Sequence, residues 1–142
     1  MIFNGNKKWE HFIHEADVGV RGIGPTLENA FEMGALALTN AVTDSNIVHA
    51  TEKIAISCAA PDREILFTDW LNAIIYKMDT LGMLFSEFHV RIKNLKLEAI
   101  IKGEKINRHR HQPAVDPKGA TYAELKVYQE NDTWIAQCIV DV

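Results

Sequence analysis

The hydrophobic period of the chain changes at Gly82, and this change is the strongest constraint on the fold. Residues 62–81 repeat apolar side chains at helical spacing, with Asp62 suited to the N-cap and Gly82 to the position just past the helix. After Gly82, apolar and polar residues alternate through 85–92 and again through 95–102. Two alternating stretches joined by a short polar turn predict a β-hairpin, so the fold must pack a long helix against strands.

The rest of the chain repeats these two patterns. A second helix is predicted to begin at Pro25-Thr26, with Thr26 as its N-cap. Residues 8–24 read as one long strand or as a strand with a bulge at Glu15-Ala16. The other expected strands cover residues 47–58, 120–128 and 134–140. The resulting order, ββαβαββββ, predicts an α+β fold with a mixed or antiparallel sheet and two main helices, in a single domain over residues 1–142.

Composition limits the partners and the compartment. The chain has 142 residues and a net charge of −4, which argues against electrostatic binding of DNA or RNA by the domain as a whole. No apolar run approaches the ~18 residues that a membrane span needs, and the first residues lack the apolar core of a secretory signal. We therefore expect a cytoplasmic protein without membrane contact. Cys58 and Cys138, both in apolar contexts, are expected to be buried free thiols.

A carboxylate stands at the head of a predicted strand, at Asp17. A lone aspartate in that position is ordinarily a turn residue. The chain ends in Asp141-Val142, directly after an apolar strand. If that strand lies beside the one headed by Asp17, the Asp17 and Asp141 side chains and the α-carboxylate of Val142 converge. Grouped carboxylates repel unless a cation lies between them, and oxygen ligands suit calcium, magnesium or manganese. The sequence pattern alone leaves both interpretations of Asp17 open.

Residues 105–119 form the longest irregular segment, and loops of this kind often carry function. The segment contains a group of basic and imidazole side chains, Arg108, His109, Arg110, His111 and Lys118. We expect these side chains to contact phosphate or an acidic partner surface. His109-x-His111 has no third ligand in suitable spacing and is a weak metal signal. On the second helix, Asp69 and Asn72 share a face and are expected to form a solvated edge.

Several motifs in this order resemble the archease family. The opening motif is His14-x-x-Asp17-x-Gly19, followed by a helix that starts Thr-Leu-Glu-x-Ala-Phe. The further matches, which span nearly the whole chain, are Trp70-Leu71-Asn72 with Tyr76, Gly103-Glu104, the 118–122 stretch, Trp134-x-Ala136 and the terminal Asp141-Val142. Each match is weak alone, but the ordered set with its C-terminal ending is specific.

The resemblance implies a function. Archeases are metal-binding accessory proteins of the RtcB-type tRNA ligase, which joins RNA ends using GTP and manganese. They promote guanylation of the ligase and so its repeated turnover in tRNA splicing, without being enzymes themselves. The family's metal ligands map onto Asp17, Asp141 and Val142, and calcium is the expected bound ion, with magnesium or manganese as alternatives. The implied partner is the ligase, with RNA contacted only through it and no DNA contact.

One departure and two competing functions accompany this resemblance. The family's Lys-Ala-x-Thr-Tyr-His run has Ala123 in place of its histidine, which leaves the detail of the mechanism open. The main alternative is a stand-alone metal-dependent phosphohydrolase, but the chain lacks a P-loop or nucleophile motif. His14 is not expected to act as its base, because His14 and Asp17 in one strand would point to opposite faces. A plain RNA-binding domain is disfavoured by the acidic charge.

Overall fold

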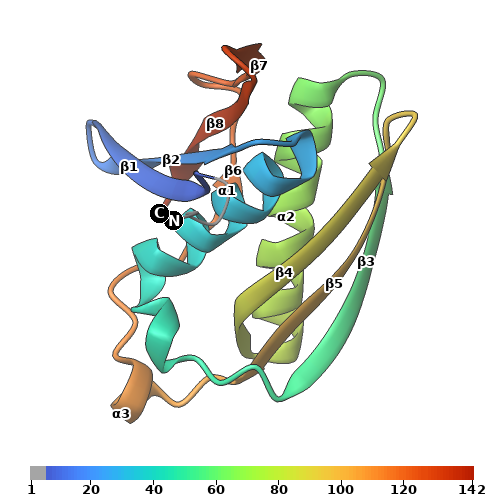
Figure 1. The fold of residues 1–142 in the computed structure, drawn as a ribbon. Coiled ribbons are helices and arrows are strands. Elements are labelled where there is room, and N and C mark those ends of the chain that lie inside the picture. Colours follow the sequence, from blue (N-terminus) through green and yellow to red (C-terminus); the bar gives the residue numbers. More distant parts are fainter. Residues whose placement is uncertain (1–5) are drawn as a thin grey trace.

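The computed structural model describes residues 6–142, which form two antiparallel sheets and two long helices (Figure 1). The strands are β1 (Lys8–His14), β2 (Asp17–Gly24), β3 (Glu52–Ala59), β4 (Met83–Lys93), β5 (Lys96–Lys105), β6 (Gly119–Ala120), β7 (Lys126–Glu130) and β8 (Thr133–Asp141). The helical elements are α1 (Leu27–Val42), α2 (Arg63–Leu81), the short α3 (Arg108–His111) and the 3₁₀ turn η1 (Ser45–Ile47). This arrangement confirms the predicted α+β class and the order of the main elements.

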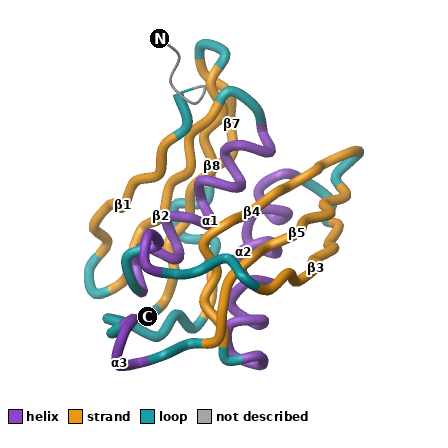
Figure 2. The backbone as a smooth tube through the Cα atoms, turned by 60° about the horizontal axis from the view of Figure 1, so that its bottom comes forward, coloured by secondary structure: helices purple, strands orange, loops and turns teal. Residues whose placement is uncertain are grey.

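The helices lie between the two sheets, as both backbone views show (Figures 1 and 2). In the first sheet the strand order is β1-β2-β8-β6, and β7 also pairs with β8. In the second sheet the order is β3-β5-β4. Because α1 packs on β2 and also on β4, and α2 packs on β3 and β6, each helix buries side chains against both sheets.

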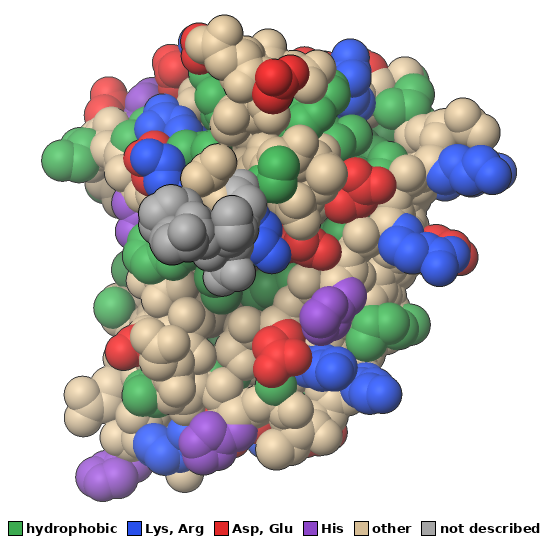
Figure 3. Space-filling view, viewed as in Figure 1, with side chains coloured by type: hydrophobic (Ala, Val, Ile, Leu, Met, Phe, Trp, Pro, Cys, Tyr) green, Lys and Arg blue, Asp and Glu red, His purple; other side chains and the backbone are tan. Residues whose placement is uncertain are grey.

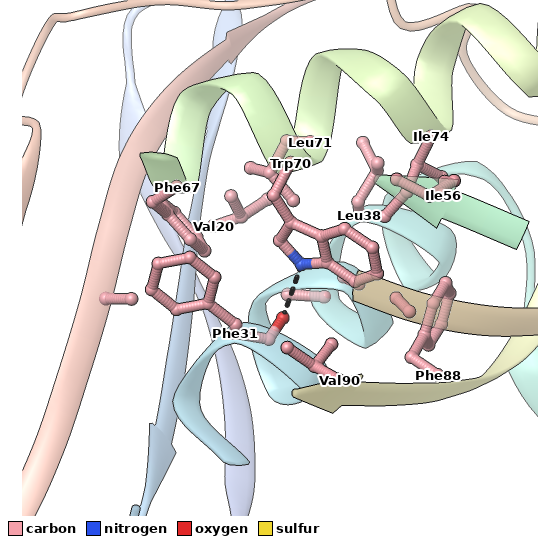
Figure 4. Packing of buried hydrophobic residues seen from close by; sticks show 14 of the residues in the cluster. Val20, Phe31, Leu38, Ile56, Phe67, Trp70, Leu71, Ile74, Phe88 and Val90 are labelled. Carbon is pink, nitrogen blue, oxygen red and sulfur yellow. Dashed lines mark hydrogen bonds between the residues drawn. The ribbon is translucent and has the colours of Figure 1, made fainter. Parts of the chain in front are cut away.

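The core between the layers is built around Trp70 (Figure 4). Its indole N–H donates to the carbonyl oxygen of Phe31 at 2.9 Å, so a fully buried donor is satisfied by the neighbouring helix. Phe31 and Phe67 meet edge to face at 5.1 Å, and Trp70 meets Phe88 of β4 in the same way at 6.2 Å. These contacts join α1, α2 and the second sheet.

Glycine permits the close approach of α1 to β2. A Cβ atom on Gly22 would lie 2.0 Å from the carbonyl oxygen of Ala30 and 2.2 Å from the amide nitrogen of Gly34. These are backbone atoms and cannot move aside as a flexible side chain would. The helix therefore rests directly on the strand that Asp17 begins, and this contact fixes the position of β2.

The predicted helix ends are confirmed. The Thr26 hydroxyl accepts a hydrogen bond from the Asn29 N–H at 3.0 Å, and the Asp62 carboxylate accepts one from Ile65 at 2.8 Å. Gly82 ends α2 in the left-handed conformation, with φ of +62°. No helix within residues 6–142 combines the length and the apolar character required to cross a membrane.

Three strand predictions need correction. Residues 8–24 form a hairpin, with Glu15 at a φ of +55°, rather than one strand or a bulged strand. The strand expected at 47–58 starts only at Glu52, because the Asp44 side chain caps the η1 turn ahead of it. The strand expected at 120–128 is divided into β6 and β7, because Glu124 adopts a φ of +53° that a continuous strand cannot contain.

Two loops also differ in detail from the expectation. The turn of the β4–β5 hairpin falls at Asn94 and Leu95, both with positive φ, rather than at Lys93-Asn94. Positive φ at both central residues matches the twist of the flanking strands. The segment 105–119 is not wholly irregular, because it contains α3.

Candidate functional site

The pairing of β2 brings the two ends of the sequence motif together. β2 pairs with β1 on one side and with β8 on the other, both antiparallel. His14 is directly opposite Asp17, and Val18 is opposite Val140. Continuing the β2–β8 register by one residue places Asp141 opposite Asp17. Directly opposed residues of antiparallel strands project from the same face of a sheet, so these three side chains belong to one row.

A hydrogen bond closes this row at the end of the chain. The amide N–H of Val142 donates to Oδ1 of Asp17 at 3.4 Å. Asp17 and Val142 are half-buried, whereas Asp141 is exposed. Figures 1 and 2 both place the C-terminus near the β1–β2 hairpin. The neighbouring strands that the convergence of Asp17 with the C-terminus requires are therefore present.

The hairpin at Glu15 changes the relation between His14 and Asp17. The two residues were expected on opposite faces of one strand, but they are cross-strand neighbours that close the turn. Nδ1 of His14 is buried and, among residues 6–142, has no hydrogen-bond partner. A buried ring nitrogen without a partner is unusual, and here it lies in the row that contains the aspartates.

Oxygen donors dominate this row, which is the chemistry that a hard divalent cation prefers. Within residues 6–142, no three side chains of His, Cys, Asp or Glu gather closely enough to hold a metal ion. That Asp17, Asp141 and the α-carboxylate of Val142 together hold a cation stays a prediction. The residues fit such an ion by donor type, because Asp17 accepts only one long hydrogen bond within the described chain.

Residues 118–121, which include the end of the segment 105–119, run beside the site. The Lys118 N–H donates to the main-chain carbonyl of Asp141 at 2.8 Å, and the Thr121 N–H donates to that of Ile139 at 2.9 Å. Gly119 pairs with Asp141 in β6. This segment, residues 118–121, carries the exposed Lys118 to the edge of the site.

Asn72 of α2 holds that segment in place. Its carboxamide oxygen accepts from the Ala120 N–H at 2.8 Å, and its amide nitrogen donates to the Ala120 carbonyl at 3.4 Å. The side chain therefore replaces a neighbouring strand for one residue of β6. The sequence analysis expected Asn72 to form a solvated edge of the helix. It did not predict the contact with Ala120, because spacing along a helix gives no information on a segment 48 residues away.

The other basic residues lie apart from this site. Arg108, His109, Arg110 and His111 form α3, which Figure 1 separates clearly from the C-terminus. Arg108 and His109 are exposed. The structure therefore brings only Lys118 of the predicted basic group next to the aspartates. Contact of any of these residues with phosphate or a partner remains a prediction.

Two of these α3 residues bind Glu104 instead. Nη2 of Arg110 lies 2.7 Å from one carboxylate oxygen, and Nε2 of His111 lies 2.9 Å from the other. The Asn107 N–H donates to Nδ1 of His111, which places the ring proton on Nε2, facing Glu104. His111 is only 2% exposed. Gly103-Glu104 was one of the motifs that resemble the archease family, but the sequence did not indicate that Glu104 binds the side chains of α3.

Electrostatics agree with this role of Glu104. Burial alone raises the pKa of the carboxyl group, but hydrogen bonds from Arg110, the His49 backbone N–H and His111 outweigh burial and lower the pKa to about 2. The His49 N–H donates at 2.7 Å. Glu104 is therefore ionised throughout the physiological range, and its charge is used to hold α3 against the segment that precedes β3.

The two cysteines offer no reactive thiolate. Both are free, as predicted; Cys138 is buried and Cys58 is half-buried. Burial raises the pKa of Cys58 to about 11 and that of Cys138 to about 12. Thiols with such values remain protonated at neutral pH and are poor nucleophiles or metal ligands.

Residues 9–142 match the model of a family described as the Archease protein family (MTH1598/TM1083). The chain is 36% identical over 141 residues to the archease of Pyrococcus abyssi and 35% identical over 138 residues to that of Sulfurisphaera tokodaii. In both cases the alignment covers 96% of this chain and 99% of the relative.

Solved structures show the same fold. The solution structure of Methanobacterium thermoautotrophicum protein 1598 superposes with a TM-score of 0.76 and 28% identity, covering 94% of this chain and 98% of that one. The crystal structure of a Thermotoga maritima archease, described as a possible chaperone, has a TM-score of 0.62 and 18% identity over 94% of this chain and 96% of its own. At that identity the second likeness concerns the fold alone.

Proposed function

The chain belongs to the archease family, and from this membership we propose that it is a metal-binding accessory factor of an RtcB-type RNA ligase. In this proposal it promotes GTP-dependent guanylation of the ligase and so its repeated turnover, and it catalyses no reaction itself. The observation that carries the proposal is the pairing of β2 with β8, which sets Asp17 against the last residue of the chain.

Three carboxyl groups would hold the cation: the side chains of Asp17 and Asp141 and the α-carboxylate of Val142. Calcium is the expected ion, with magnesium or manganese as alternatives, because all the donors are oxygens. A divalent ion bound here supplies positive charge that offsets the charge of phosphate groups at the ligase active site. The chain's own contribution is to hold the carboxylates at the end of a sheet whose strands are paired on both sides.

Lys118 adds a positive charge at the edge of this site. Its main chain is bonded to Asp141, and the segment that carries it is held by Asn72. A lysine ammonium presented from a fixed main chain suits contact with a phosphate oxygen or with a carboxylate of the partner. We propose that Lys118 makes this contact, whereas Arg110 and His111 hold Glu104.

A guanylation assay of the ligase tests the proposal. Adding this protein should increase the fraction of guanylated ligase over several turnovers, and Asp17→Ala should abolish both this stimulation and divalent-cation binding measured by calorimetry. Asp79→Ala, which removes an exposed carboxylate from the last turn of α2, is the matched control and should leave both unchanged. Normal stimulation by Asp17→Ala would refute the proposal.

A C-terminal extension tests Val142 separately. Adding a short Gly-Ser tail moves the α-carboxylate away but keeps both aspartates. The extended protein should bind the cation at least ten-fold more weakly. If its affinity equals that of the original chain, Val142 is not a ligand and the site consists of side chains only.

One structural observation supports the alternative function. Because His14 is a cross-strand neighbour of Asp17, a stand-alone phosphohydrolase would have a candidate base beside its metal site. Cleavage of a phosphate ester by the purified protein, lost in Asp17→Asn and in His14→Ala, would support this alternative. The absence of turnover, together with stimulation of the ligase, would reject it.

A further inference from the structure

The outer face of the second sheet is uncovered and has an ordered arrangement of side chains. Alternate residues of β3, β5 and β4 point away from the helices, and the registers line them up in rows across the three strands. These rows are Lys53–Lys102–Glu87, Ala55–Ile100–His89, Ser57–Glu98–Arg91 and Ala59–Lys96–Lys93. We call this surface the outer face. Residues on the opposite side, such as Ile56 and Val90, are buried against the helices.

Positive charge is concentrated on the outer face. It carries five lysines and arginines and two glutamates, for a net charge of +3. The whole chain has a net charge of −4, so the remainder carries −7. Figure 3 shows Lys and Arg side chains standing out along the right side of the molecule, over β4 and β5. The chain is therefore acidic overall but has one basic surface.

The register opposes like charges at both ends of this surface. Lys53 is directly opposite Lys102, and Lys93 is directly opposite Lys96. Like charges in such positions destabilise a sheet. Among residues 6–142, no carboxylate forms an ion pair with Lys53, Lys93 or Lys96. The fold gains nothing from these pairs, and an anionic partner would relieve their repulsion.

The glutamates neutralise the surface only weakly. Glu87 lies 3.9 Å from Nζ of Lys102, and Glu98 lies 3.8 Å from Arg91. The Arg91–Glu98 pair is highly exposed, so water and salt screen it. Much of the positive potential of the outer face is therefore available to a bound anion.

The centre of the outer face is shallow and lacks large anchors. A depression of about 640 Å³ there is lined by small and apolar residues such as Ala55, Ser57 and Ile100, by His89 and Arg91, and by the carboxylates of Glu32 and Glu98. Among these rows the imidazole of His89 is the one aromatic ring that points outward, and no Phe, Tyr or Trp does. A protein interface draws its energy from buried aromatic and arginine anchors, and single-stranded RNA is held by stacking on aromatic rings. Arg91 and His89 are both largely exposed, and two such side chains offer few anchors to either kind of partner.

A duplex backbone matches it better. The two lysine pairs lie six residues apart along β5, which is roughly 20 Å in an antiparallel strand. Spaced cations around a shallow centre suit phosphates that project from a helical duplex, and double-stranded RNA is recognised mainly by shape and by its phosphates and 2′-hydroxyls. Figure 1 shows this sheet on the right and the C-terminus on the left, so the two surfaces do not compete.

We propose that the outer face binds the sugar–phosphate backbone of double-stranded RNA without reading its sequence. The proposal goes beyond the accessory function, in which RNA is contacted only through the ligase, and it does not depend on the metal site. The sequence argued against direct RNA contact because net charge gives no information on how charge is distributed over the surface.

Fluorescence anisotropy with a labelled 20-base-pair RNA duplex tests the proposal. At low salt the full chain should bind with micromolar affinity, and the affinity should fall steeply as salt is added. Lys93→Glu with Lys96→Glu should weaken binding at least ten-fold. The matched control, Lys8→Glu with Lys126→Glu, changes the net charge equally at exposed positions of the first sheet and should stay within two-fold.

A second pair of variants and a competition experiment distinguish the remaining outcomes. If the glutamate pair fails to fold by circular dichroism, Lys93→Gln with Lys96→Gln replaces it and should lower the slope of log affinity against log salt by about 1 to 2. A polyglutamate peptide of matched charge should not displace the duplex. Displacement by that peptide would assign the face to an acidic protein, and equal loss in the control pair would show non-specific attraction. Either result, or no binding at low salt, overturns the proposal.

Discussion

Two carboxylate centres in this molecule, at Glu104 and at Asp17, differ in how fully the protein satisfies them. Glu104 receives hydrogen bonds from Arg110, His111 and the His49 backbone, which lower its pKa to about 2. Asp17 receives one long bond, from the amide of Val142. Both residues are simply acidic side chains in the sequence. In the structure, the carboxylate oxygens of Glu104 are occupied by hydrogen bonds from the protein, whereas those of Asp17 can still accept a ligand.

This difference distinguishes a carboxylate that stabilises the fold from one that can bind a ligand. Every oxygen of Glu104 already has a donor, so a ligand there would have to displace the protein's own groups. A ligand at Asp17 would displace at most one weak bond. The free energy of unfolding should therefore respond strongly to changes at Glu104 and weakly to changes at Asp17, and four measurements test that contrast.

The largest effect should follow Glu104→Ala. The change leaves the buried His111 and the guanidinium of Arg110 without their acceptor, and we expect it to lower the free energy of unfolding by about 3 kcal/mol. Urea denaturation measures this loss. Glu130→Ala, at an exposed position of β7, is the control and should change stability by less than about 0.5 kcal/mol. Similar losses in both variants would mean that Glu104 is not an anchor.

The next largest effect concerns pH. Because the pKa of Glu104 is lower in the folded protein than its ordinary value of 4.5, the ionised group stabilises the fold above pH 4.5. That contribution should disappear as the pH falls from about 4.5 towards 2, and should amount to roughly 2 kcal/mol after allowance for screening. In Glu104→Gln the acid-induced loss of stability should be smaller by this amount. A profile identical to that of the original chain would contradict the pKa shift.

A smaller effect is expected from Asn72→Ala. It removes both hydrogen bonds to Ala120 and should cost about 1 kcal/mol, with faster hydrogen exchange at the Ala120 amide. Asn72→Asp keeps the acceptor but loses the donor and should retain part of the protection. Because Ala120 lies beside the Asp17 centre, this variant shows how far that centre depends on α2. Unchanged exchange at Ala120 would show that Asn72 does not hold the segment.

The smallest change in stability should come from Asp17→Asn. The variant keeps an oxygen acceptor for the Val142 amide and removes a negative charge from a row that also contains Asp141. We expect the free energy of unfolding to change by less than about 0.5 kcal/mol, while cation binding is lost. Differential scanning calorimetry with and without calcium separates the two. A large loss of stability without calcium would place Asp17 in the same class as Glu104.

The sequence predicted the elements whose signals are local. The long helix α2 has a helical repeat, an aspartate cap and a terminating glycine, and each feature lies within its own segment. The convergence of Asp17 with the C-terminus was predicted only on the condition that the first and last strands lie side by side, and the β2–β8 pairing meets that condition. In α2 the residues that decide the structure are neighbours in the sequence.

The sequence predictions failed where the local structure depends on residues that are distant in the sequence. The turn at Glu15 contains neither glycine nor proline, so no local signal in the sequence predicts the hairpin. The position of β6 depends on Asn72 of another element, which bonds to Ala120. The burial of His111 against Glu104 was not predicted, because nothing near either residue in the sequence indicates this contact.

The pairing of β2 with β8 also sets the order of folding. Val18 and Val140 meet only after almost the whole chain has been drawn into one loop, whereas β4 and β5 join through a tight turn. Closing a long loop is slow because its entropy is lost before any contact compensates for it. The second sheet can therefore form early, and the first sheet must close late. The Asp17 centre then exists only in molecules that have finished folding, and a partner that recognises it would engage completed chains alone.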